Sequence, residues 1–219
     1  MVTVRGSQES VEARLKSGLL VCSCGGTLRP WGHARPRRVA TFSGLARMRP
    51  RRAICRDGCG RTHVLLPGLL LSRRRYSAAV IFAALALRAA GLKTAAVAAR
   101  LRLPVPGRPG QWWSVPASTA GSWLSRFASR AGALRQAFLA VLPLADAQAR
   151  PVIAARSAAG DALAVLEAVT AGLRARFGLD GLAAHEVAAH LTGGMLLAPV
   201  LPGLAGNTTW FAMAAAGSS

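Results

Sequence analysis

The sequence is short of acidic residues and almost free of lysine. Of its 219 residues, 8 are Asp or Glu and 28 are Lys or Arg, which gives a formal net charge of +20. All but two of the basic residues are arginine, whose planar guanidinium pairs bidentately with phosphate and with guanine edges. An excess of this size attracts polyanions. Nucleic acid is therefore the first candidate partner.

Long hydrophobic runs are also missing. The N-terminal residues are polar and lack the apolar stretch of a secretory signal. The apolar segment Ala78–Leu87 is much shorter than the roughly 20 residues that cross a bilayer. A second one, Met195–Leu204, is interrupted by Pro199 and Pro202. We therefore expect no membrane segment and a cytoplasmic location.

The basic residues are concentrated in the middle of the chain. Between Cys22 and Arg135 there are 21 Lys or Arg and one acid, Asp57, whereas the segments on either side are nearly neutral. Hydrophobic residues make up 52% of the whole sequence, which is enough for a folded core. The charge pattern indicates a basic binding region followed by a neutral region.

Cysteines are few, but their spacing indicates a metal site. They form a C-x-C-G-G turn and a C-x3-C-G turn: Cys22 and Cys24, then Cys55 and Cys59. Four thiolates that converge from two turns predict one structural Zn²⁺ ion. The alternative is four reduced cysteines without metal, since the usual spacing is C-x2-C. His33 and His63 could each replace a cysteine, contact phosphate, or lie on the surface as ordinary polar residues.

The patterning predicts a mainly α fold in which a small zinc-ribbon-like β module precedes a helix-turn-helix and a helical C-terminal region. Short strands are expected at 38–42, 52–55 and 62–66, and helices at 76–90, 95–101, from about 119, 162–177 and 182–191. The expected parts are an N-terminal tail (1–21), the zinc-ribbon-like module (22–72), the helix-turn-helix domain (76–135) with a Pro/Gly-rich loop insertion (102–116), and the C-terminal region (136–219) with an irregular tail.

The third predicted helix of the basic region has one apolar face and one polar face. Ser118 is placed to cap it, and Ala120, Trp123 and Leu124 belong to the apolar face. The opposite face is free to contact a partner. The helices after residue 136 could form a homodimer.

Several strings resemble a widespread actinobacterial domain family of unknown function, in which a zinc ribbon precedes a transposase-like helix-turn-helix. They are CGGTLRPWGHARPRR, RPRRAICRDGCGRTHVLLPGLLLSRRRY, AAVAARL and PASTAGSWLSRF, within residues 21–138. The resemblance implies sequence-specific DNA binding, a bacterial cytoplasmic location associated with the nucleoid, and no catalytic residues. That family has C-x2-C knuckles, so its first-ligand positions would fall on Val21 and Arg56 here.

The polar face of the third predicted helix also indicates double-stranded DNA, because a recognition helix places its N-terminal residues at base edges in the major groove. Arg126 is the best candidate for a guanine contact. The alternative is that this helix face is solvated and contacts no partner. On this helix the candidates are Ser118, Thr119, Ser122, Ser125, Arg126 and Arg130. Phosphate contacts are expected from Arg35, Arg37, Arg38, Arg49, Arg51, Arg52, Arg73, Arg74 and Arg75, any of which could instead be a solvated charge.

The tryptophans divide into two groups. Trp31 and Trp123 are expected in the core. Trp112 and Trp113 could stack on unpaired bases or cover a neighbouring apolar surface.

The sequence favours a non-enzymatic DNA-binding regulator or transposase-derived binding protein. The alternatives are an RNA-binding or protein-interaction ribbon and the remnant of a transposase without its nuclease. His185 and His190 are five residues apart around a Glu, which puts them off a common helix face and argues against a metalloprotease site. No small-molecule substrate site is evident.

Overall fold

The structure is a computed structural model that describes residues 2–4, 6–148 and 157–198. The strands are β1 (Val2–Val4), β2 (Leu28–His33), β3 (Arg37–Thr41), β4 (Gly44–Met48), β5 (Arg51–Cys55), β6 (Thr62–Pro67), β7 (Arg102–Pro104) and β8 (Trp112–Ser114). The helices are α1 (Gln8–Lys16), α2 (Ala78–Ala89), α3 (Thr94–Arg100), α4 (Ala117–Ala128), α5 (Ala131–Ala145), α6 (Ala158–Phe177) and α7 (Ala184–Leu191). Most of the predicted C-terminal tail lies outside the described residues.

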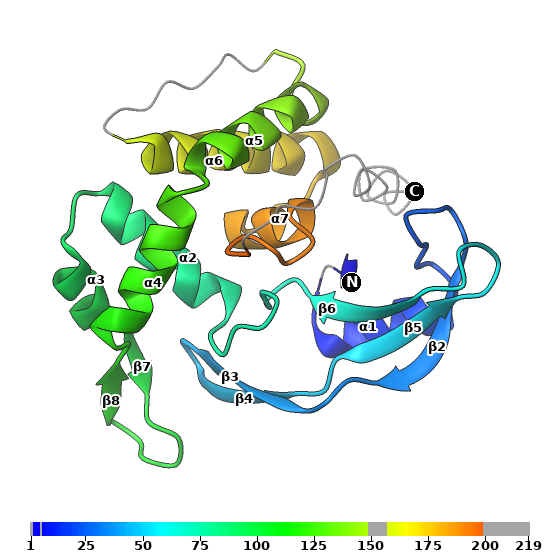
Figure 1. Cartoon of the computed structure of the whole chain (residues 1–219), viewed down its shortest axis with the longest axis horizontal. Coiled ribbons are helices and arrows are strands. Elements are labelled where there is room, and N and C mark those ends of the chain that lie inside the picture. The colour runs from blue at the N-terminus through cyan, green and yellow to red at the C-terminus, as the bar shows by residue number, and fades with distance from the viewer. Residues whose placement is uncertain (1, 5, 149–156, 199–219) are drawn as a thin grey trace.

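The predicted mainly α class is wrong. Of the described residues, 44% are helix and 22% are strand, with a multi-stranded sheet in the N-terminal part and helices after it (Figure 1). The larger sheet has the order β1-β6-β5-β2, in which β1 runs parallel to β6 and the other pairs are antiparallel. β3 and β4 form a separate hairpin, as do β7 and β8. This part of the chain is therefore larger than the small β module expected.

The first residues are part of the fold, whereas the sequence predicted a tail. Strand β1 pairs with β6, and α1 packs on the sheet. The Ser7 side chain accepts a hydrogen bond from the backbone N–H of Ser10 and so caps α1. Val11 and Leu15, one turn apart on α1, are both buried in the sheet's core. With only two apolar positions on a polar helix, this amphipathic pattern is easily missed.

Helices α2, α3 and α4 match the predicted helices to within a few residues and pack around one core. Trp123 of α4 is buried, as predicted, and its ring meets Tyr76 edge to face at 4.9 Å between centroids. Helix α4 begins at Ala117 with Pro116 at the N-cap, so the expected Ser118 cap is wrong. Ser118 lies instead in the exposed first turn.

The predicted loop 102–116 contains the β7–β8 hairpin. Leu103 and Val115 are almost fully buried, and the Val115 N–H donates to the Leu101 carbonyl. This apolar anchoring outweighs the prolines and glycines of the segment, which are gathered at the turn and the strand ends. A short turn between α3 and α4, as a helix-turn-helix requires, is therefore replaced by a hairpin.

Helices α5 and α6 pack side by side, and α7 leads back toward the sheet. The expected boundary at residue 135 falls inside α5. The turn after α7 joins the two parts of the chain: Ser72 N–H donates to the Gly194 carbonyl at 2.8 Å, and Gly194 lies against Leu66 of β6. None of the helices in the described ranges is long and apolar enough to cross a membrane.

Candidate metal centre and arginine surface

Two turns at one end of the sheet bring the four cysteines together. Cys22 and Cys24 lie in the turn that leads to β2, whereas Cys55 ends β5 and Cys59 lies between β5 and β6. The pairing of Leu28 with Cys55 across β2 and β5 holds the two turns side by side. All four sulfur atoms lie within 4.8 Å of one another, so the predicted convergence is confirmed.

The distances between the sulfurs fit a single tetrahedral ion. The Cys22 and Cys59 sulfurs are 3.6 Å apart, and those of Cys24 and Cys55 are 3.5 Å apart. Zinc–thiolate bonds of about 2.3 Å in a tetrahedron place sulfurs about 3.8 Å from each other. The one-residue shortening of the first turn and the one-residue lengthening of the second therefore leave a set of thiols compatible with a structural metal site.

The two thiols of one sulfur pair have opposite ionisation preferences. The backbone N–H groups of Gly26 and Cys59, followed by the neighbouring thiols, lower the pKa of Cys24 to about 6. Burial, followed by the Cys24 thiol, raises the pKa of Cys55 to about 12. Cys24 thus favours the thiolate that a metal requires, and a bound cation would supply the charge that favours the thiolate of Cys55.

Two glycines leave room for the sulfurs. A Cβ on Gly26 would lie 2.6 Å from the Cys55 sulfur, and a Cβ on Gly58 would lie 2.7 Å from the Cys24 sulfur. These contacts are closer than atoms pack, so any side chain at either position must displace a thiol. The glycines of both Cys turns are therefore needed for the site itself.

We expect Gly26→Ala to weaken metal binding about 10- to 100-fold, the range found when a residue that orients metal ligands is changed. Competition with a chromophoric chelator measures this effect. Gly132→Ala is the matched control, because Gly132 lies in α5 with open space around its Cβ position. Equal metal affinity of the two variants would contradict the steric argument.

Neither histidine replaces a cysteine. The His63 Nε2 lies 3.3 Å from the Cys22 sulfur, beside the cluster rather than in it. Burial, with a smaller contribution from Arg61, lowers the pKa of His63 and favours the neutral ring. His33 lies next to Arg51, with 3.2 Å between the His33 Nε2 and the arginine Nη1. His63 can therefore orient a ligand sulfur, whereas His33 belongs to a different part of the surface.

The β3–β4 hairpin places two arginines directly opposite each other. Arg38 and Arg47 are cross-strand partners, and both are exposed. Like charges in this position destabilise a hairpin unless something else offsets them. The sequence prediction missed Arg47, although the two-residue turn at Phe42 and Ser43 would have placed it opposite Arg38.

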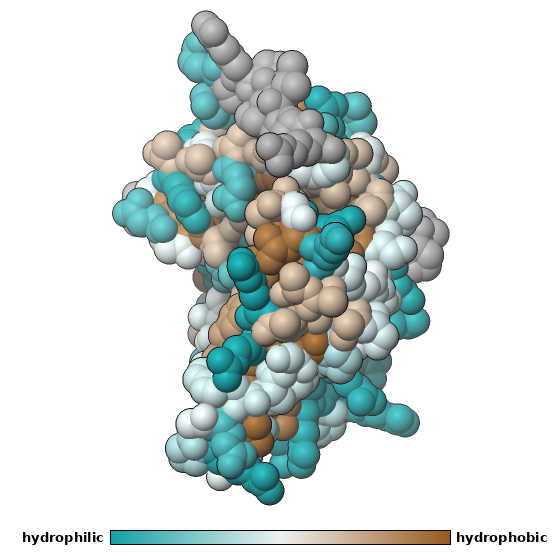
Figure 2. Space-filling model, turned by 90° about the vertical axis from the view of Figure 1, so that its left-hand side faces the viewer, coloured by the Kyte–Doolittle hydropathy of each residue, from teal (hydrophilic) through white to brown (hydrophobic). Residues whose placement is uncertain are grey.

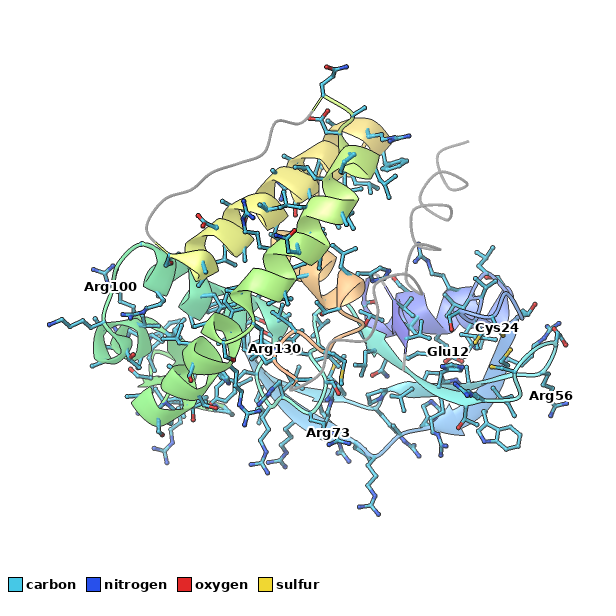
Figure 3. The ribbon with its side chains drawn as sticks, turned by 45° about the horizontal axis from the view of Figure 1, so that its top comes forward. Glu12, Cys24, Arg56, Arg73, Arg100 and Arg130 are labelled. Atoms are coloured by element: carbon cyan, nitrogen blue, oxygen red, sulfur yellow. The ribbon has the colours of Figure 1, made fainter. Side chains whose placement is uncertain are left out.

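A second arginine-rich segment lies beside this hairpin. The Arg75 carbonyl accepts a hydrogen bond from the Ala40 N–H of β3. Arg73 is exposed and has a φ of 56°, the left-handed region that side chains other than glycine seldom adopt. The pKa of Arg74 is lowered by burial and then by Arg126 of α4, which shows that α4 borders the same segment. Figure 3 places Arg73 between the cysteine end, marked by Cys24 and Arg56, and the end that carries Arg100.

We call the exposed set that spans these elements the arginine surface: Arg38, Arg47, Arg73, Arg75 and Arg126. It joins residues of the β3–β4 hairpin, the segment before α2, and α4. Ser122 and Ser125 are exposed on α4 with Arg126, whereas Thr119 is half-buried. The structure thus brings together predicted contacts that lie about 90 residues apart in the sequence.

Other arginines that were predicted to contact DNA interact with groups of the protein itself. Arg74 donates to the Leu197 carbonyl at 3.0 Å, and Arg130 lies 3.4 Å from two neighbouring carbonyls of the same turn. Arg51 forms an ion pair with Glu12 at 2.9 Å. We therefore leave these three out of the arginine surface.

The remaining predicted arginines differ in exposure. Arg35 and Arg49 are exposed, and Arg52 is half-buried. Arg37 is half-buried as well, and its Nε and Nη2 have no hydrogen-bond partner among the described residues. Burial lowers the pKa of Arg37.

His185 of α7 lies against an aromatic ring of α2. The Glu186 carboxylate accepts a hydrogen bond from the Ala183 N–H at 3.3 Å at the start of the helix. The His185 ring lies 6.2 Å from that of Phe82, and burial lowers its pKa, while Glu186 opposes this shift. In the part of the chain that the structure describes, only the four cysteines form a group that could hold a metal ion.

Comparison of the chain with protein-family models, with curated proteins and with solved structures found no match.

Proposed function

We propose that this protein binds double-stranded DNA through the arginine surface, and that the four cysteines hold a zinc ion that fixes the adjoining sheet. The observation that carries the proposal is a set of exposed arginines from three elements, none of which has an acidic partner among the described residues. The proposed role is binding rather than catalysis.

Within the ranges that the structure describes, no ion pair neutralises the charges of this surface. Both ion pairs found in the described residues involve Glu12, with Lys16 and Arg51 as its partners. Between Asp57 and Asp146 the sequence has no acidic residue at all. Exposed arginines that repel one another gain most from a partner with closely spaced negative charges, and a phosphate backbone is such a partner.

Helix α4 supports duplex DNA as the form of that polyanion. Its outward face carries Arg126 with small hydroxyl side chains, Ser122 and Ser125, which let the helix backbone approach a groove closely. The major groove is wide enough for one helix, and arginine reads guanine there. In this proposal Arg126 contacts a base, while the arginines of the hairpin and of the 73–75 segment contact phosphates.

Zinc is the ion that suits the cysteine cluster best, because four thiolates at tetrahedral distances are characteristic of structural zinc sites. Two of the ligands, Cys22 and Cys55, are part of the buried core between α1 and the sheet. An ion held there would tie β2 to the β5–β6 turn. Its contribution is to the fold, and through the sheet to the position of β3 and β4.

A gel-shift titration of a short duplex across salt concentrations tests the proposal. If about 6–10 phosphates are contacted, the affinity should fall roughly 10³–10⁵-fold between 50 and 200 mM salt. Binding that is insensitive to salt, or that does not favour duplex over single strands of the same sequence, would contradict duplex binding. The same titration with a double-stranded RNA shows whether the protein prefers DNA or RNA duplexes.

A further inference from the structure

We infer that the β7–β8 hairpin binds an unpaired base next to a DNA duplex, by stacking the base on the exposed ring of Trp112. This inference rests on the proposed duplex binding and adds a second contact of different chemistry. The ligand class is DNA with an unpaired nucleotide adjoining the double helix, such as a single-stranded overhang.

The inner side of the hairpin is fixed to the helices. Leu103 is almost fully buried, and the Trp113 ring lies 5.9 Å from that of Tyr76, which in turn contacts Trp123 of α4. The position of the hairpin relative to α4 is therefore set by packing. On this side, Trp113 covers an apolar surface of the helical part.

The outer side presents the other tryptophan. Trp112 is 50% exposed and pairs with Pro104 across the hairpin. The exposed half of this aromatic ring is available to stack on a ligand. The adjacent Trp113, by contrast, is half-buried and packs against Tyr76.

The exposed indole is accompanied by cations. Arg102, at the start of β7, and Arg108, in the turn, are both exposed. The turn is ordered, since the Val105 N–H donates to the Gln111 carbonyl and the Gln111 N–H donates to the Arg108 carbonyl. In Figure 1 the hairpin extends away from α3 and α4. The face that carries it mixes hydrophilic side chains with separated apolar areas (Figure 2).

An exposed ring on a hairpin that also carries two exposed arginines matches a nucleotide, because a base stacks on the ring while its phosphates lie near the cations. In a duplex the faces of the bases are covered by their neighbours, so only an unpaired base is available to Trp112. The hairpin is followed directly by α4, the helix proposed to enter the groove. The unpaired base would thus lie beside the duplex that α4 contacts.

The test compares a blunt duplex with the same duplex that carries a short single-stranded overhang, in fluorescence-anisotropy titrations at fixed salt. We expect the wild-type protein to prefer the overhang about 5- to 150-fold, the range for stacking of one base. Trp112→Ala should remove this preference and leave the affinity for the blunt duplex unchanged. Trp112→Phe, which keeps an aromatic face, should retain part of it.

Trp31→Ala is the matched control, since Trp31 is 49% exposed but lies on β2. It should leave the preference unchanged. No overhang preference in a wild-type protein that binds blunt duplex would overturn this inference alone. Equal losses for both duplexes in Trp112→Ala would also overturn it, whereas failure of the wild-type protein to bind blunt duplex would overturn the proposed function.

Discussion

Cys24→Ser is expected to release the metal and to unfold the cysteine end of the sheet. Cys24 is exposed, so the substitution leaves no cavity in the core, and any loss of structure must come through the metal. Structural zinc contributes about 10–16 kcal/mol of apparent binding free energy in zinc-finger peptides. The sheet's core between α1 and the strands is small, whereas α2 to α7 share a larger one.

Zinc analysis of the purified protein, together with hydrogen exchange, measures this effect. We expect about one zinc per chain in the wild-type protein and almost none in the variant. The amides of β2, β5 and β6 should lose protection, while those of α5 and α6 keep theirs, because these helices pack in the larger core. Chelation of the wild-type protein should reproduce this pattern.

Ser23→Ala provides the control, since Ser23 is exposed in the same turn and offers no ligand to the cluster. It should keep both the zinc and the protection. A wild-type protein that contains no zinc and keeps its protection in chelator would contradict a structural role for the cysteines.

The cysteine cluster and most of the helices could be predicted from the sequence because their signals are local. A Gly-containing turn at each Cys pair predicts convergence whatever the surrounding fold is. Helix α2 has a continuous apolar pattern, and α4 has apolar residues at helical spacing, with Trp123 and Phe127 in the core. Strands β5 and β6 were recognisable as β-type runs, and both were predicted to within a residue.

The sheet was underestimated because much of it depends on pairing between distant segments. Strand β2 contains Pro30 and Gly32, two residues that are poor strand formers, and is extended because it pairs with β5. All of its residues after Leu28 are exposed, including Trp31 at the register shift between Pro30 and Gly32, so the predicted core position of Trp31 is wrong. Strand β1 has three residues and pairs with β6, about 60 positions away.

The sequence also does not predict which individual arginines are exposed and which bind other groups of the protein. Arg73, Arg74 and Arg75 are consecutive, but among the contacts of the described residues only Arg74 donates to a carbonyl of the turn after α7. Arg130 was predicted to face DNA with Arg126, yet it points to the same turn. A run of like residues on a chain does not indicate which of them the tertiary structure uses for itself.

The second large effect is expected from removing three charges of the arginine surface, in the variant that combines Arg73→Gly, Arg75→Ala and Arg126→Ala. Glycine is chosen at position 73 because it adopts the positive φ found there without strain. Arg73 and Arg75 are the two phosphate contacts of this set, and each contributes about 0.9 to the slope of log affinity against log salt, so the slope should decrease by roughly 2. At 0.15 M salt this corresponds to an affinity lower by about 30-fold, and loss of the Arg126 base contact should lower the affinity further by about 1–3 kcal/mol.

A variant of equal charge separates location from net charge. Arg29→Ala, Arg56→Ala and Arg61→Ala remove three exposed arginines around the cysteine end, outside the arginine surface. For a short duplex this control should change the salt slope by less than about 1, because distant charges are screened over roughly 8–10 Å. If both triple variants lose the same affinity, the protein attracts DNA by its total charge, and the arginine surface is not the binding site. If only the first variant weakens binding while its melting temperature is unchanged, the contacts lie where β3, β4, the 73–75 segment and α4 meet.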